Sequence, residues 1–217
     1  MGELKKSVPV FILILLPMLL IVLQRETGSA LVYLAFFLML YREGMPGSIL
    51  FAGVCAVVYF VVGIRFGKDL MPDACTPVGE FVVFSLVTVW SASLVYAYCD
   101  KKEAVRNILL YHGGSILLAL LFSVYVIPFN LVYFLYVECL ALVVYLLYLS
   151  LHERLMHYFY IALFAVGSIG FLYSADYVFE EILEPHQRIR IEVLLGMEED
   201  LAGAGYNVNQ SKIAIGS

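Results

Sequence analysis

Seven long apolar stretches, separated by short charged breaks, dominate this sequence. Because the hydrocarbon core of a bilayer is ~30 Å thick, a helix needs about 20 apolar residues to cross it, and each stretch predicts a membrane-spanning helix. A soluble domain is excluded, since 63% of the residues are hydrophobic and only 14% are charged, whereas soluble domains are about 45–50% apolar. The expected spans run approximately from Val8 to Leu23, Ser29 to Tyr41, Ser48 to Ile64, Phe81 to Cys99, Ile108 to Phe129, Leu131 to Leu149 and Tyr158 to Tyr173.

The pattern therefore predicts an all-α polytopic bundle over residues 1–173, followed by a polar segment over residues 174–217. The second span is short for a full crossing, and its bounds are the least defined. A cleavable signal peptide would also place Lys5 and Lys6 before an apolar stretch. That alternative fails because no small-residue cleavage site follows Leu23.

Basic residues in the breaks predict the orientation of the bundle. With the N-terminus in the cytoplasm, seven basic residues lie inside and three lie in short outer loops, as the positive-inside rule favours. The inner residues are Lys5, Lys6, Arg42, Lys101, Lys102, Arg106 and Arg154, and the outer residues are Arg25, Arg65 and Lys68. An odd number of spans then places the polar segment after Tyr173 on the outer face, so that we expect a large extracytoplasmic loop at the C-terminus.

Charge and cysteine spacing exclude two other classes of protein. The net charge of −5, without a long basic run, leaves little to neutralise a phosphate backbone, so nucleic-acid binding is not expected. The four cysteines have neither CxxC nor Cys/His ligand spacing, so that neither a zinc site nor a disulfide framework is predicted. Cys55 and Cys139 sit in apolar runs as small packing residues.

The polar C-terminal segment is the first place to look for chemistry, because functional residues concentrate in loops on rigid scaffolds. Asp200 precedes Gly203 and Gly205, whose small size allows tight turns beside a ligand. A carboxylate placed there could remove a proton from a bound substrate. Three cations could hold an anionic headgroup beside it, namely Arg188, Arg190 and Lys212. Composition alone favours a simpler interpretation, in which the segment is an acidic, solvated loop.

Several motifs in the sequence resemble those of the RodA/FtsW (SEDS) family of peptidoglycan polymerases. In the polar segment these are Pro185-His-Gln-Arg-Ile-Arg190, Asp200-x-x-Gly203-x-Gly205-Tyr206 and Gln210-Ser211-Lys212-Ile-Ala-Ile-Gly216-Ser217, which resemble the large extracytoplasmic loop of the family. The shorter stretch Gln24-Arg25-Glu26-Thr27-Gly28-Ser29-Ala30 resembles a Gln-Pro-Asp-x-Gly-Thr-Ala motif at the outer end of a span. Both matches fall on the side that the charge count makes extracytoplasmic.

The resemblance implies a function, which is polymerisation of lipid II into glycan strands at the outer leaflet of the bacterial inner membrane. It implies that Asp200 is the catalytic loop aspartate, either as general base or as the group that orients the acceptor hydroxyl. Gln210, Ser211 and Lys212 are expected to bind substrate. From their chemistry, Arg188, Arg190 and Lys212 are candidates to offset pyrophosphate charge, a task that a divalent cation could share. The family also implies a class B penicillin-binding protein as partner, and the ending of the sequence favours the elongation member over the division member.

The sequence also departs from the family pattern. Leu201 replaces a usual proline, and Arg25-Glu26 replaces Pro-Asp. Four extra spans, over about residues 48–150, separate the two motifs, while several spans of the family are missing before the first motif and after the loop. We therefore expect an internal fragment that has no polymerase activity in isolation.

Two alternatives come from other classes of protein. Glu138 and His112 are ionisable residues in or near apolar runs, where such residues favour a proton path or transport site. A transporter or flippase for a lipid-linked precursor is therefore the second hypothesis, although His112, expected near the end of a span and followed by two glycines, also fits a simple helix contact. A non-catalytic scaffold is the third. Gly167 and Gly170 are expected to allow close helix packing.

Overall fold

The computed structural model describes residues 12–21, 32–33, 35–72 and 75–198, together with the single positions Gly203, Tyr206, Gln210, Ile213, Ala214 and Gly216. These residues divide into two compact units, Met1–Val57 and Val58–Ser217, and each is described by itself. The described residues are helical, apart from turns, short connections and one isolated bridge between Leu70 and Pro77.

The first unit contains a short apolar helix, Ile12–Ile21, then α3 (Ala35–Arg42) and the first half of α4 (Gly47–Phe66). Gly44, at φ +106°, turns the chain between α3 and α4 in a conformation that side chains rarely adopt. The first two expected spans therefore correspond to helices of 10 and 8 residues in the described part of the chain. The residues on either side of Ile12–Ile21 lie outside the described part of the chain, so the first two expected spans remain predictions.

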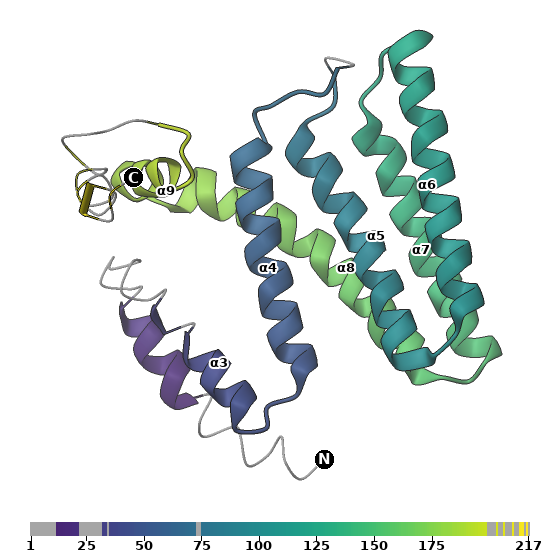
Figure 1. The fold of residues 1–217 in the computed structure, drawn as a ribbon, viewed down its shortest axis with the longest axis horizontal. Helices are drawn as coiled ribbons and strands as arrows, with labels where there is room; N and C mark the ends of the chain where they lie inside the picture. The colour runs from purple at the N-terminus through teal and green to yellow at the C-terminus, as the bar shows by residue number, and fades with distance from the viewer. Residues whose placement is uncertain are drawn as a thin grey trace. The chain divides into compact units, whose positions relative to one another are not determined.

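The second unit is a helical bundle with a terminal extension (Figure 1). Its elements after α4 are α5 (Val78–Cys99), α6 (Lys102–Tyr125), α7 (Leu131–His152), α8 (Met156–Tyr177), the π-helical turn η1 (Val178–Ile182) and α9 (Pro185–Leu194). Helix α5 packs against α6, α7 and α8, while α7 also packs against both of its neighbours in sequence. Small residues such as Ala92 and Ala162 lie in the core with Leu146 and Tyr158, and let the helices approach closely.

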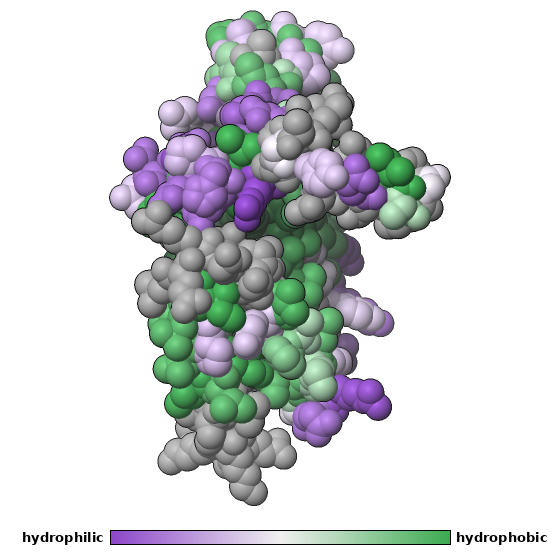
Figure 2. Space-filling view, turned by 90° about the vertical axis from the view of Figure 1, so that its left-hand side faces the viewer, coloured by the Kyte–Doolittle hydropathy of each residue, from purple (hydrophilic) through white to green (hydrophobic). Residues whose placement is uncertain are grey.

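Five helices have the length and apolar composition of membrane spans among the described residues: Gly47–Phe66, Val78–Cys99, Lys102–Tyr125, Leu131–His152 and the continuous helical stretch Met156–Ile182. Many large apolar side chains lie on their exposed surfaces, including Leu118 at 69% and Leu140 at 64% exposure. Exposing such an apolar surface to water would cost free energy, whereas an apolar surface is expected where a helix faces lipid. Figure 2 shows hydrophilic residues gathered over α9, while long stretches of the remaining described surface are hydrophobic.

The turns between α5 and α6 and between α7 and α8 lie at one end of the bundle. Asp100 and Arg154 adopt left-handed backbone conformations in these turns. Lys101 Nζ lies 2.6 Å from Glu153 Oε2 and so joins the two turns. The hydrogen bond with Glu153, followed by its charge, raises the pKa of Lys101 above the usual range.

The opposite end carries the connection between α4 and α5. There the buried Thr76 hydroxyl oxygen accepts a hydrogen bond from Leu131 N at 2.9 Å, at the first turn of α7. Lys68, in the same connection, lies 3.7 Å from Glu192 of α9. The polar segment after α8 thus begins at this end of the bundle, away from Lys101. Which end faces the cytoplasm remains a prediction.

Helix bounds differ most from the sequence expectation at the start of α6 and at the end of α8. Helix α6 begins at Lys102 rather than near Ile108, because Lys102, Glu103 and Arg106 extend it beyond the apolar run. Helix α8 and η1 continue to Ile182 rather than ending at Tyr173. The first part of the expected C-terminal loop is therefore helical, and no large loop is seen in the described part of the chain.

The positions of close helix packing also correct an expectation. A side chain at Gly167 or Gly170 would meet nothing within 4 Å, so neither glycine marks a tight contact. The close approach lies instead at Gly79, where an added β-carbon would sit 2.8 Å from Gly63 O and 2.9 Å from Gly67 N. The end of α4 thus passes the start of α5 with backbone against backbone.

Candidate functional site

Helix α9 carries the two arginines that were expected to bind an anion. Its start is well specified, because Pro185 occupies the first turn and Glu184 and Gln187 form a reciprocal capping box. Gln187 is buried, and its side-chain oxygen accepts a hydrogen bond from Glu184 N at 3.2 Å. The Pro-His-Gln stretch of the motif therefore has a local structural role, which is to begin this helix.

The structure separates the two arginines by role. Arg188 Nε donates to Leu183 O at 3.1 Å, and its terminal nitrogen donates to Glu180 O. These carbonyls lie at the end of η1, where the helix leaves them without intrahelical partners. Arg188 thus caps η1, whereas the side chain of Arg190 is exposed. Of the two, Arg190 is the better placed to contact an anion in solution or at a membrane surface.

The remaining residues of the expected site are only partly described. Gly203, Tyr206 and Gln210 are exposed, and Tyr206 N donates to Gly203 O at 3.1 Å. The other expected residues lie outside the described part of the chain: Gln24, Glu26, Gly28, Asp200, Gly205, Ser211 and Lys212. The roles expected for them, and for the motif as a site, therefore remain predictions.

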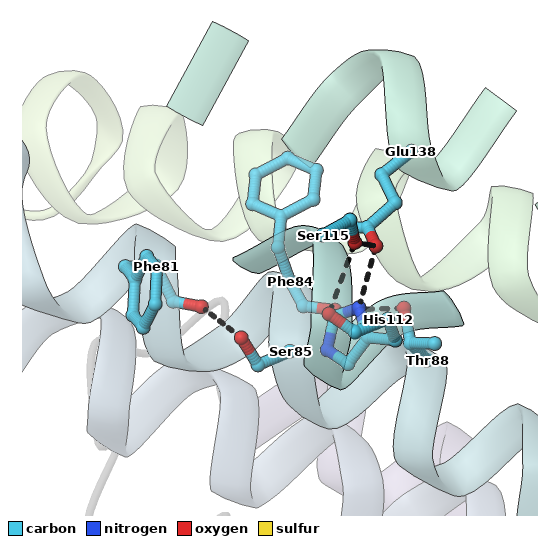
Figure 3. Close-up of polar contacts among 7 residues, drawn as sticks. All are labelled: Phe81, Phe84, Ser85, Thr88, His112, Ser115 and Glu138. Carbon is cyan, nitrogen blue, oxygen red and sulfur yellow. Dashed lines mark hydrogen bonds and ion pairs between the residues drawn. The ribbon is translucent and has the colours of Figure 1, made fainter. Parts of the chain in front are cut away.

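A second polar constellation lies inside the bundle, between α6 and α7 (Figure 3). His112 and Glu138 are 7% and 4% exposed, and His112 Nδ1 lies 3.2 Å from Glu138 Oε1. Ser115 Oγ donates to the same carboxylate oxygen and lies 3.0 Å from His112 O. Three polar side chains therefore meet between two helices that have the length and apolar composition of membrane spans.

A cavity of about 300 Å³ adjoins this constellation. Helix α5 contributes one lining residue, and α6 and α7 contribute the others. They are Thr88, Asn107, Ile108, Tyr111, His112, Glu138, Ala141, Leu142 and Tyr145. Asn107, Tyr111 and Ala141 are exposed, so the cavity opens on the outer side of the α6–α7 pair.

This geometry corrects the interpretation of His112 and adds a residue. His112 lies well within α6 rather than near its end, and a β-carbon added at Gly113 or Gly114 would touch nothing. Ser115 was missed, although its spacing of three residues from His112 places both on one face of a helix. Among the described residues, no group of three His, Cys, Asp or Glu side chains could hold a metal ion.

Comparison with known proteins gives one informative match. The chain is 27% identical to "Peptidoglycan glycosyltransferase RodA" of Treponema pallidum (strain Nichols), over 217 residues that take in 99% of this chain and 40% of the relative. The matched stretch includes the four spans over about residues 48–150 that were interpreted as an insertion. No protein-family model matches the chain, and no solved structure matches it. The resemblance expected from the motifs is confirmed as a distant similarity to RodA that runs along the whole chain and spans about 40% of the length of that relative.

Proposed function

We propose that this chain forms part of a membrane glycosyltransferase that polymerises lipid II into peptidoglycan strands during cell elongation. The observation that carries the proposal is the similarity to RodA over 99% of the chain. The five apolar helices of span length support it, because a lipid-linked substrate must be held at a membrane. The expected inner-membrane location, the seven spans and the outward-facing C-terminal segment belong to the same proposal.

Asp200 is the proposed catalytic carboxylate. Glycan polymerisation requires an acceptor hydroxyl to attack an anomeric carbon while the lipid pyrophosphate departs. A carboxylate beside the hydroxyl removes its proton or orients it, and cations beside the pyrophosphate stabilise the charge that develops there. Arg190 is the described cation that fits the second task, since Arg188 already donates to two backbone carbonyls.

Two partners accompany this proposal. Lipid II is the substrate, and a class B penicillin-binding protein supplies the crosslinking activity. Lys212, Gln210 and Ser211 are proposed to contact the substrate beside Asp200, and a divalent cation could share the neutralisation of pyrophosphate. Because the chain spans about 40% of the length of the RodA relative, the rest of such a protein would contribute to the groove for the lipid, and residues 1–217 in isolation are expected to be inactive.

The test is substitution of Asp200→Asn in a full-length protein that contains this chain. Removing a general base or an orienting carboxylate costs typically about 10²–10⁴-fold in rate, so we expect polymerisation of lipid II to fall by at least about 100-fold while membrane insertion is retained. Asp100→Asn is the matched control, because asparagine tolerates the left-handed conformation of that turn. Polymerisation at the wild-type rate by the Asp200→Asn protein would place the catalytic carboxylate elsewhere in the molecule.

One observation favours a second candidate, a transporter or flippase for a lipid-linked precursor. Glu138, His112 and the cavity beside them form a polar site within the spans, as transport pathways require. The same Asp200 substitution separates the two functions. A transporter would keep polymerisation by its partner enzymes unchanged in the Asp200 variant and would lose lipid translocation when Glu138 is replaced.

A further inference from the structure

The polar constellation of His112, Ser115 and Glu138 is unusual in its setting. A buried carboxylate or imidazole in a membrane span is costly unless its hydrogen-bonding groups are satisfied, and such residues mark functional sites. Here the three side chains come from α6 and α7, the two helices that contribute most of the residues lining the cavity. Packing alone would be served as well by apolar residues of the same size.

One hydrogen bond and one ion-pair contact of the constellation meet at the same oxygen atom. Glu138 Oε1 receives the Ser115 hydroxyl and lies 3.2 Å from His112 Nδ1. Glu138 Oε2 is buried and has no hydrogen-bond partner among the described residues. One carboxylate oxygen is therefore held in position, while the other is an open acceptor that a donor from outside the protein can satisfy.

The cavity shows where such a donor can come from. Glu138 lines it together with the apolar side chains of Ile108 and Leu142, and its outer side is formed by the exposed residues Asn107, Tyr111 and Ala141. Since α6 and α7 have the length and composition of membrane spans, this outer side is expected to face hydrocarbon. A ligand that enters there must itself be mostly apolar.

We propose that this cavity binds a membrane-soluble amphiphile whose hydroxyl or amine group donates a hydrogen bond to Glu138 Oε2. The hydrocarbon part of the ligand leaves the cavity past Ala141, along the outer side of α6 and α7. The site is separate from the proposed loop chemistry and does not depend on the polymerase function. His112 and Ser115 are positioning residues, since they hold the other carboxylate oxygen.

The proposal is tested with three photoreactive probes that share a twelve-carbon chain bearing a diazirine. One ends in a hydroxyl, one in a primary amine and one in a methyl ether, which can accept but cannot donate a hydrogen bond. The chain is placed in lipid nanodiscs, irradiated with each probe and analysed by peptide mass spectrometry. We expect saturable labelling of α6 and α7 by at least one donor probe, about tenfold above the methyl ether.

Two variants identify the site. Glu138→Met removes the acceptor but keeps a side chain of similar length, whereas Ala141→Trp closes the outer side of the cavity and keeps Glu138. Both should lower donor-probe labelling to the level of the methyl ether. Glu103→Gln and Ala97→Trp, which change an exposed carboxylate and an exposed alanine outside the cavity, are the matched controls and should label like the wild type.

Labelling by the hydroxyl probe supports a neutral donor as ligand, and labelling by the amine alone supports a cationic one. The proposal is overturned if all three probes label equally, or if labelling in the Ala141→Trp variant equals that of the wild type. Because Ala141 is exposed, a tryptophan there need not disturb the core, and this variant keeps the test decisive even where Glu138→Met fails to fold.

Discussion

Individual glycines in this bundle differ in how much space an added side chain would have. A β-carbon added at Gly79 would lie 2.8 Å from Gly63 O, closer than real β-carbons approach, whereas one at Gly167 would touch nothing. We therefore expect Gly79→Ala to destabilise the protein by about 1–3 kcal/mol, the usual cost of overpacking. Gly167→Ala should be neutral or stabilising by up to about 1 kcal/mol, because alanine is the better residue in a helix.

These two variants are compared by thermal unfolding in detergent, followed through reaction of buried thiols such as that of Cys139 with a fluorescent maleimide. Cys139 is 2% exposed, so that it reacts when the helices separate. Equal unfolding midpoints for both variants would contradict a close contact between the end of α4 and the start of α5.

At the scale of the elements, the start of α7 depends on a residue from the distant connection between α4 and α5. Thr76 is fully buried, and its hydroxyl oxygen accepts from Leu131 N at 2.9 Å. Thr76→Val keeps the shape and removes the acceptor, which leaves a buried N–H group unsatisfied. We expect a loss of about 1–3 kcal/mol in unfolding free energy, measured with the same thiol assay.

Thr76→Ser is the matched control for this element, since it keeps the hydroxyl and should stay close to the wild type. Ser93→Ala, which removes an exposed hydroxyl bonded to Val89 O, should change stability by less than about 0.5 kcal/mol. If Thr76→Val unfolds with the wild-type free energy, the hydrogen bond to Leu131 N does not support α7. An equal loss in Thr76→Ser would show that packing of the methyl group contributes as much as the hydrogen bond.

The elements also show what the sequence could and could not predict. The five long helices follow from their apolar runs, because the thickness of a bilayer sets a minimum length that few other structures need. The bounds of α6 and α8 were missed, since a helix continues beyond the hydrocarbon wherever its residues tolerate water, as Lys102 and Glu180 do. Of the candidate sites, Glu138 and His112 were both singled out, but no contact between them was predicted. Their meeting with Ser115 depends on the register of α6 against α7, which the sequence of either helix does not specify.

At the scale of the whole molecule, the two ends of the bundle differ in their charged groups, and this difference predicts how the chain sits in a membrane. Lys68 and Glu192 join the α4–α5 connection to α9 at one end, while Lys101 and Glu153 join two turns at the other. The positive-inside count assigns the second end to the cytoplasm. The start of the proposed catalytic segment would then lie outside, where lipid-linked glycan precursors are polymerised.

Single cysteines test this orientation in cells that express the protein without its four native cysteines. Lys68→Cys and Arg190→Cys should react with a membrane-impermeant maleimide added to intact cells, whereas Lys102→Cys and Arg106→Cys should react only after permeabilisation. All four side chains are exposed, so a lack of reaction reports the membrane and not burial. If Lys102→Cys reacted in intact cells, the orientation would be opposite to the one predicted, and the proposed catalytic segment would not lie outside. Because the Lys68–Glu192 contact requires α9 to share a side with the α4–α5 connection, labelling of positions 68 and 190 from different sides would contradict the bundle itself.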